Sequence, residues 1–260
     1  KLVKPTKVMT NAQTLNVDAI REWIRTTLSK FDLSRPDGRW LFAYDLSQPE
    51  FERLEQLIKD SCQDTGGFSH LVSRRNAFSA LFVFYAAEWW KHNYAGGVWD
   101  WAPIVESLGG DEESFPQQLR SECVTLGLRY WGHTPLSHGK RFIGAIAAHG
   151  GIPMKLLAQG AGRLAVVLGL VLKQAGRYSW SLTQIQDGVE QYQYQLPSAY
   201  RRPEISELLA RFIDTVLQLK SEYRLSERLD PIGYLDAEVP NWMRRFPISL
   251  EVEAAQTLLV

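Results

Sequence analysis

The residues with the clearest chemical potential lie in the segment EWWKHNYAGGVWDW, residues 88–101, where Glu88 and His92 are four positions apart. On a helix this spacing places the carboxylate and the imidazole on one face, where they can exchange a proton or begin a metal site. Asp100, beyond a Gly-Gly turn, is a third candidate group. Because a Glu/His pair alone lacks the further ligands that a metal requires, the pattern favours a structural role for Glu88.

Four of the nine tryptophans fall in the same segment, which raises the question of a recognition platform. The stretch that leads into it, NAFSALFVFYAAEWW at 76–90, is apolar on every side, which is typical of a helix covered all round by other elements. The Gly-Gly turn allows a reversal that stacks the later tryptophans over the earlier ones. We therefore expect a structural core that contains Glu88, Trp89, Trp90, Trp99 and Trp101.

The formal net charge is zero, yet the charges are unevenly distributed along the chain. Residues 115–180 carry eight basic side chains and one acidic side chain, and they hold ten of the nineteen glycines. A basic, glycine-rich stretch can bind phosphate groups, although its cations can equally pair with the acidic flanks. The candidate phosphate-binding or nucleic-acid-binding residues are Lys140, Arg141, Lys155 and Arg163, with Arg201 and Arg202 beside a group of tyrosines.

Motifs that would fix a reaction are missing from the sequence. The GKR at 139–141 lacks the first glycine and the hydroxyl of a P-loop, and GxSxG, HExxH and CxxC do not occur. We therefore expect no metal and no cofactor, and the sequence favours a non-catalytic protein. Cys62 and Cys123 lie on apolar stripes, which indicates buried thiols.

Helical periodicity dominates the chain. SFPQ at 114–117 and SLTQ at 181–184 predict capping boxes, and residues 203–219 carry a continuous apolar stripe. The run LAVVLGLVL at 164–172 is too short to span a membrane and predicts a core helix. Only residues 39–46 could form a strand, so we expect an all-α fold: an irregular multi-helix bundle of roughly ten helices with at most one short strand or hairpin.

The length of 260 residues suits one large domain or two small ones. We expect an N-terminal extension at 1–15, a compact helical domain at 16–225, and a tail at 226–260 that leads into a further C-terminal part. The chain does not begin with methionine and it ends on apolar residues, from which we expect a fragment of a larger protein. The absence of a signal peptide or membrane span favours the cytoplasm.

Three stretches, FYAAEWWKHNYAGGVWDW, HGGIPMKLL and LPSAYRRPEI, carry a resemblance that extends over residues 40–250. Together they resemble the N-terminal region of a family of large bacterial proteins carried on mobile genomic islands. The resemblance implies a cytoplasmic anti-phage defence protein, in gene clusters of the Druantia kind, that lies beside a large helicase. It implies no catalytic motif and no site residues.

Three functions remain open on the sequence. The first is a non-catalytic helical module that contacts the remainder of its own chain or a helicase-type partner protein. The second is a nucleic-acid-binding domain that uses the basic surface of residues 127–177, with DNA as a possible ligand. The third, a more distant alternative, is an enzyme with a site around Glu88 and His92, which would require a pocket open to solvent.

Overall fold

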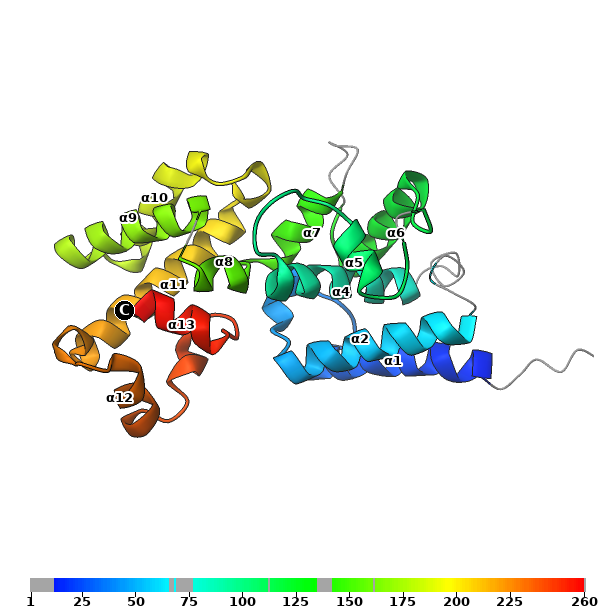
Figure 1. Cartoon of the computed structure of the whole chain (residues 1–260), viewed down its shortest axis with the longest axis horizontal. Helices are drawn as coiled ribbons and strands as arrows, with labels where there is room; N and C mark the ends of the chain where they lie inside the picture. Colours follow the sequence, from blue (N-terminus) through cyan, green and yellow to red (C-terminus); the bar gives the residue numbers. More distant parts are fainter. Residues whose placement is uncertain are drawn as a thin grey trace, which may run out of the picture. The chain divides into compact units, whose positions relative to one another are not determined.

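The computed structural model describes residues 12–65, 68, 77–111, 113–134, 142–160 and 162–259, apart from the side chains of 12–17, 64, 65 and 77. In these ranges the structure consists of α-helices and short 3-10 helices and has no strand, which confirms the all-α class (Figure 1). The α-helices are α1 (Ala12–Ser29), α2 (Gln48–Thr65), α4 (Ala77–Asn93), α5 (Ala102–Glu106), α6 (Gln117–Tyr130), α7 (Ile143–Gly150), α8 (Met154–Ala158), α9 (Gly162–Tyr178), α10 (Leu182–Tyr192), α11 (Pro203–Glu222), α12 (Pro231–Glu238) and α13 (Val252–Leu259). The 3-10 helices are η1 (Leu41–Tyr44), η2 (Gln193–Gln195), η3 (Ser198–Tyr200), η4 (Leu225–Glu227) and η5 (Trp242–Arg245).

The chain divides into two compact units, and the division falls inside α4. Unit 1 takes the chain up to Arg39 together with Gln48–Tyr85 and Asp100–Phe142. Unit 2 takes Trp40–Ser47, Ala86–Trp99 and everything from Ile143 onward. Each unit therefore builds its core on a different half of the same apolar helix.

In unit 1, α6 packs closely against the first half of α4. A side chain at Gly127 of α6 would overlap the backbone oxygen of Ser79, so only glycine allows this approach. Trp131, which follows α6, is fully buried, and its indole Nε1 donates to the backbone oxygen of Ala80 at 2.9 Å. The predicted burial of Cys123 is confirmed in the same helix pair, and Cys62 of α2 is also buried.

In unit 2, α9, α10 and α11 lie side by side (Figure 1). The predicted capping box at the start of α10 is confirmed, because the Ser181 hydroxyl accepts from the backbone N–H of Gln184 while the Gln184 side chain accepts from the backbone N–H of Ser181 at 2.8 Å. The stripe predicted in residues 203–219 forms the buried face of α11. Its buried apolar members are Ile205, Leu208, Leu209, Ala210, Phe212, Ile213, Val216 and Leu219.

Residues 231–259 form α12, η5 and α13 and belong to unit 2. Their buried side chains include Leu235, Trp242 and Phe246. Helix α13 packs against α8, where the Thr257 hydroxyl donates to the backbone oxygen of Ala158 at 2.8 Å. Residues 226–260, for which we expected a tail, thus contribute buried side chains to the core of this unit.

Two local sequence predictions differ from the structure. The possible strand at 39–46 contains the 3-10 helix η1, and the chain leaves it at Asp45 in the left-handed conformation. The SFPQ motif does not cap α6, whose N-cap is Pro116 without a side-chain bond; Ser114 instead closes a turn with Asp111. Both differences arise because local side-chain bonds and burial compete with the pattern that the sequence suggests.

Candidate functional site

Glu88, the first candidate in the sequence, is sealed inside unit 2. Its side chain is 0% exposed, and one carboxylate oxygen, Oε2, lies 3.0 Å from Nζ of Lys91, whose side chain is also 0% exposed. The second oxygen, Oε1, has no hydrogen-bond partner among the described residues. A buried carboxylate needs such a counter-charge, and Lys91 provides it.

His92 connects this pair to the segment that precedes α13. Its Nε2 lies 3.5 Å from Glu88 Oε2, and its Nδ1 lies 3.0 Å from Oε1 of Glu251. Lys91 Nζ also approaches the backbone oxygen of Leu46 at 3.5 Å. The cluster therefore joins the second half of α4 to two segments that are distant in the sequence.

The geometry of the cluster favours a structural role. A catalytic group must be reached by substrate, whereas Glu88 is completely covered. Asp100, the third candidate, belongs to unit 1, while Glu88 and His92 belong to unit 2. No group of three or more His, Cys, Asp or Glu side chains suited to a metal ion occurs in the described part of the chain.

The tryptophans of residues 88–101 mostly serve packing. Trp90 is buried, stacks on Tyr94 with ring centroids 4.0 Å apart, and meets the edge of Trp99 at 5.1 Å, as the predicted reversal requires. Trp90 Nε1 donates to the hydroxyl of Tyr200 at 2.8 Å, and burial raises the pKa of that tyrosine. Trp101 is buried in unit 1, whereas Trp89 and Trp99 are half-buried.

The basic candidates have varied surroundings. Lys140 and Arg141 lie outside the described residues. Arg201 Nε donates to the backbone oxygen of Leu196 at 2.8 Å, and Arg202 Nε donates to that of Ala199 at 3.2 Å, so both side chains hold the turn around η3. Arg202 also lies 5.8 Å from the ring centroid of Trp40.

Lys155 and Arg163 are both exposed. Lys155 Nζ approaches Oδ1 of Asn93 at 3.4 Å. Arg163 lies near the start of α9. The same helix carries two further exposed cations, Lys173 and Arg177, which were not among the candidates from the sequence. Their signal in the sequence was helical spacing combined with the absence of any acidic residue in α9.

The exposed side of α9 is a surface of mixed chemistry. Val166 is 50% exposed and Leu170 is 38% exposed, whereas the opposite side of the helix is buried against its neighbours in unit 2. The predicted core helix is therefore only half covered. We use the name outward face of α9 for six of its exposed residues: Arg163, Val166, Gly169, Leu170, Lys173 and Arg177.

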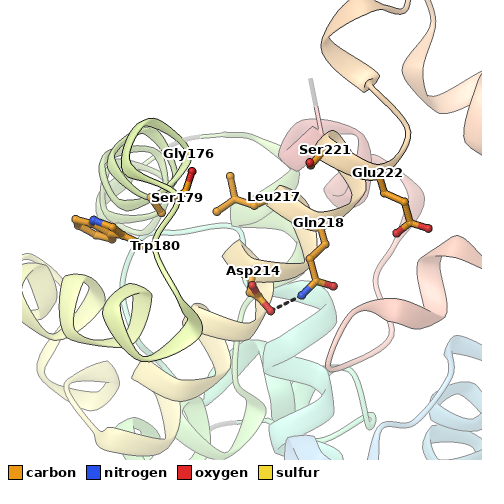
Figure 2. Close-up of a pocket in the computed structure, with 9 residues that line it drawn as sticks. Gly176, Ser179, Trp180, Asp214, Leu217, Gln218, Ser221 and Glu222 are labelled. Atoms are coloured by element: carbon orange, nitrogen blue, oxygen red, sulfur yellow. Dashed lines mark hydrogen bonds between the residues drawn. The ribbon is translucent and has the colours of Figure 1, made fainter.

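A shallow groove of about 500 Å³ borders this face at Gly176, between the end of α9 and α11 (Figure 2). Two carboxylates, those of Asp214 and Glu222, line it. Each already accepts a hydrogen bond, from Gln218 Nε2 at 2.7 Å and from Arg245 Nη1 at 2.8 Å, respectively. Since both carboxylates already have partners, the groove offers little free hydrogen-bonding capacity to a ligand. The outward face of α9, in contrast, presents exposed apolar side chains.

Two family models match most of the chain. A family model described as the YjiT N-terminal domain matches residues 7–152, and one described as the YjiT second domain matches residues 159–260. Protein YjiT of Escherichia coli (strain K12) is 26% identical over 245 residues, which cover 91% of this chain and 45% of that protein. The chain thus spans a little less than half of this relative.

No solved structure matches the chain significantly. In the described residues no helix is both long and apolar enough to cross a membrane. The first family model ends before α8 and the second begins after it, and both include residues of unit 2. Since the model of the N-terminal domain alone covers more than half of the sequence, the chain belongs to the YjiT family.

Proposed function

We propose that this chain is a non-catalytic helical module that docks a protein surface on the outward face of α9. The observation that carries the proposal is the exposure of Val166 and Leu170 one helical turn apart on a helix whose opposite side is buried. Covering both side chains would contribute about 1 kcal/mol each, since fully burying such a side chain contributes about 1.5–3 kcal/mol. A single exposed aliphatic residue needs no explanation, but a paired set on one face marks an interaction surface.

The wider role in this proposal is that of a cytoplasmic bacterial protein in an anti-phage defence system, with a helicase-type protein or the remainder of its own chain as the docked surface. That context rests on the resemblance of the three sequence stretches to genomic-island proteins. The docking proposal rests on α9 and can be tested without it.

Nucleic-acid binding is the second candidate function. It is favoured by one observation: Arg163, Lys173 and Arg177 lie on one helix that has no acidic residue. Phosphate contacts require such cations, and they make binding strongly dependent on salt. The aliphatic side chains between the cations favour protein, because a phosphate backbone offers nothing apolar to cover them.

A photo-cross-linking experiment tests the docking function. A photoreactive amino acid replaces Leu170 in the full-length protein in its own cells, and a control protein carries it at Ala237, an exposed position of α12 in the same unit. Docking predicts an adduct from position 170 and none from position 237. An adduct with another chain gains mass, whereas contact with the remainder of its own chain gives an internal link.

Two variants then separate the two candidate functions. Val166→Asp removes the apolar centre and keeps all three cations, so it should abolish the protein adduct and leave any DNA binding largely intact. Arg163→Glu with Lys173→Glu keeps the aliphatic residues and should weaken DNA binding alike for all sequences. If position 170 yields neither an adduct nor an internal link, or if Val166→Asp leaves the cross-link unchanged, docking through α9 is rejected.

A further inference from the structure

Gly169 is an anomaly in the middle of α9. Glycine in a helix interior is less favourable than alanine by roughly 1 kcal/mol, so it needs a local reason. A Cβ added at Gly169 would meet no heavy atom within 4 Å among the described residues, and the backbone there has ordinary helical φ. Neither packing nor conformation within the described part of the molecule explains the glycine.

For the two other glycines of α9, the backbone conformation or the packing inside the molecule explains why glycine is present. Gly162 has φ of +76°, which a residue with a side chain rarely adopts. A Cβ at Gly176 would lie 3.3 Å from Cδ2 of Leu217, so close packing against α11 accounts for it. Gly169 lies between Val166 and Leu170 on the exposed side, and among the described residues neither a positive φ nor a close neighbour accounts for it.

The exposed residues around Gly169 follow the spacing of a helix–helix seam. Arg163, Val166, Leu170, Lys173 and Arg177 are separated by three, four, three and four residues, which is the alternation that two packed helices share. They extend over about 21 Å at 1.5 Å per residue. A glycine beside the centre of such a seam lets the second helix approach more closely than any side chain would.

The charges on the face define the chemistry of that second helix. The three cations stand toward the ends of the seam and the aliphatic residues at its centre. A second copy of α9 in a two-fold pairing would bring six cations together, and like charges across an interface are unfavourable. A helix with an apolar centre and carboxylates at its ends is complementary to both features.

The geometry points to an acidic, amphipathic α-helix of a partner protein as the occupant of the outward face of α9, packed directly against Gly169. This inference rests on the proposed docking function and adds the kind of element, its charge and its contact point. It predicts a specific defect for any side chain introduced at position 169.

A synthetic peptide helix serves as the probe. It has about the length of α9, carries leucines at seam spacing in its centre and glutamates toward both ends, and is labelled for fluorescence anisotropy. A matched peptide replaces each glutamate with lysine. The inference predicts saturable binding of the acidic peptide to the purified chain, weaker at high salt, and no binding of the lysine peptide.

Variants at position 169 provide the decisive measurement. Gly169→Ala should raise the melting temperature, because alanine favours the helix and has room, yet it should weaken peptide binding. Gly169→Leu should lower affinity about tenfold or more by pushing the helices apart. Ala237→Leu on α12 adds comparable bulk outside the face and should leave the affinity unchanged.

A higher melting temperature for Gly169→Ala would show that its weaker peptide binding does not come from unfolding. The inference is overturned if the acidic peptide does not bind, if the lysine peptide binds equally well, or if Gly169→Leu binds with unchanged affinity. An internal cross-link from position 170 would overturn the partner protein as source. In the first three cases a protein adduct that is sensitive to Val166→Asp would still support docking, and in the last case an internal link with the same sensitivity would do so. The two proposals therefore fail separately.

Discussion

Replacing Lys91 with methionine should destabilise the protein more than almost any other single exchange of a charged residue. The variant keeps the length and apolar stem of the side chain but removes the ammonium group that lies 3.0 Å from Glu88 Oε2. Glu88 has 0% exposure and its other oxygen has no hydrogen-bond partner in the described part of the chain, so no water can replace the lost cation without disrupting the core. Breaking such a buried pair costs about 3–5 kcal/mol.

Removing both charges should cost far less than removing one. In the double variant Glu88→Met, Lys91→Met no buried charge of the pair remains, and apolar replacements of buried ion pairs are often neutral. The contact of His92 with Glu88 at 3.5 Å is lost as well, so we expect a residual cost of about 1–2 kcal/mol. The double variant should therefore be more stable than Lys91→Met.

Urea denaturation followed by circular dichroism and tryptophan fluorescence measures these differences, provided that the two transitions coincide. The matched control is Arg211→Met on α11, which breaks an exposed pair with Glu207 at 2.6 Å; their side chains are 57% and 51% exposed. That change should cost less than about 1 kcal/mol. The reasoning is refuted if Lys91→Met costs no more than Arg211→Met, or if the double variant loses the sum of the two single losses.

Three further predictions concern local structure. Ser181→Ala removes the capping box of α10 and should lower the free energy of unfolding by about 1 kcal/mol, measured by thermal denaturation; an unchanged melting temperature would contradict it. Burial raises the thiol pKa of Cys62 to about 11 and of Cys123 to about 12, so neither should react with iodoacetamide near pH 8 until urea unfolds the chain. Because the folded state retains these protons at higher pH than the unfolded chain, both thiols should reduce stability as pH rises above about 9, seen as a lower urea midpoint. Gly127→Ala should cost at least about 1–3 kcal/mol, since its Cβ would overlap the backbone oxygen of Ser79; full stability in urea would show that the helices can separate without loss.

Much of the helical architecture can be predicted from the sequence because local signals suffice for it. The capping box at Ser181 and the apolar stripe of α11 depend on residues within a few turns of one another, and both are confirmed. The strand considered at 39–46 failed for the opposite reason. Its aromatic residues suggest a strand locally, but the burial of Leu41, Phe42 and Tyr44 within a tight 3-10 turn depends on contacts made elsewhere.

The partner of Glu88 was missed although it lies three residues away in the same helix. Lysine is almost never fully buried, so the sequence alone gives no reason to place Lys91 in the core beside Glu88. Lys91 is nevertheless buried because Leu46 and Glu251, from segments distant in the sequence, cover this end of α4. No local pattern contains that information.

The contrast between α4 and α9 explains why the tryptophan-rich segment is core and a plainer helix is the candidate surface. Both are strongly apolar, but an apolar run is buried only where other elements cover it. The second half of α4 is covered from separate parts of unit 2, through contacts of Lys91 with Leu46, of Trp90 with Tyr200 and of His92 with Glu251. Helix α9 packs against its neighbours on one side and leaves Val166 and Leu170 exposed on the other. Gly169 lies beside them, and no close contact within the described residues requires a glycine there. Exposed apolar side chains that share one face and are flanked by polar groups are candidates for an interaction site, so the search for a binding partner should begin at α9.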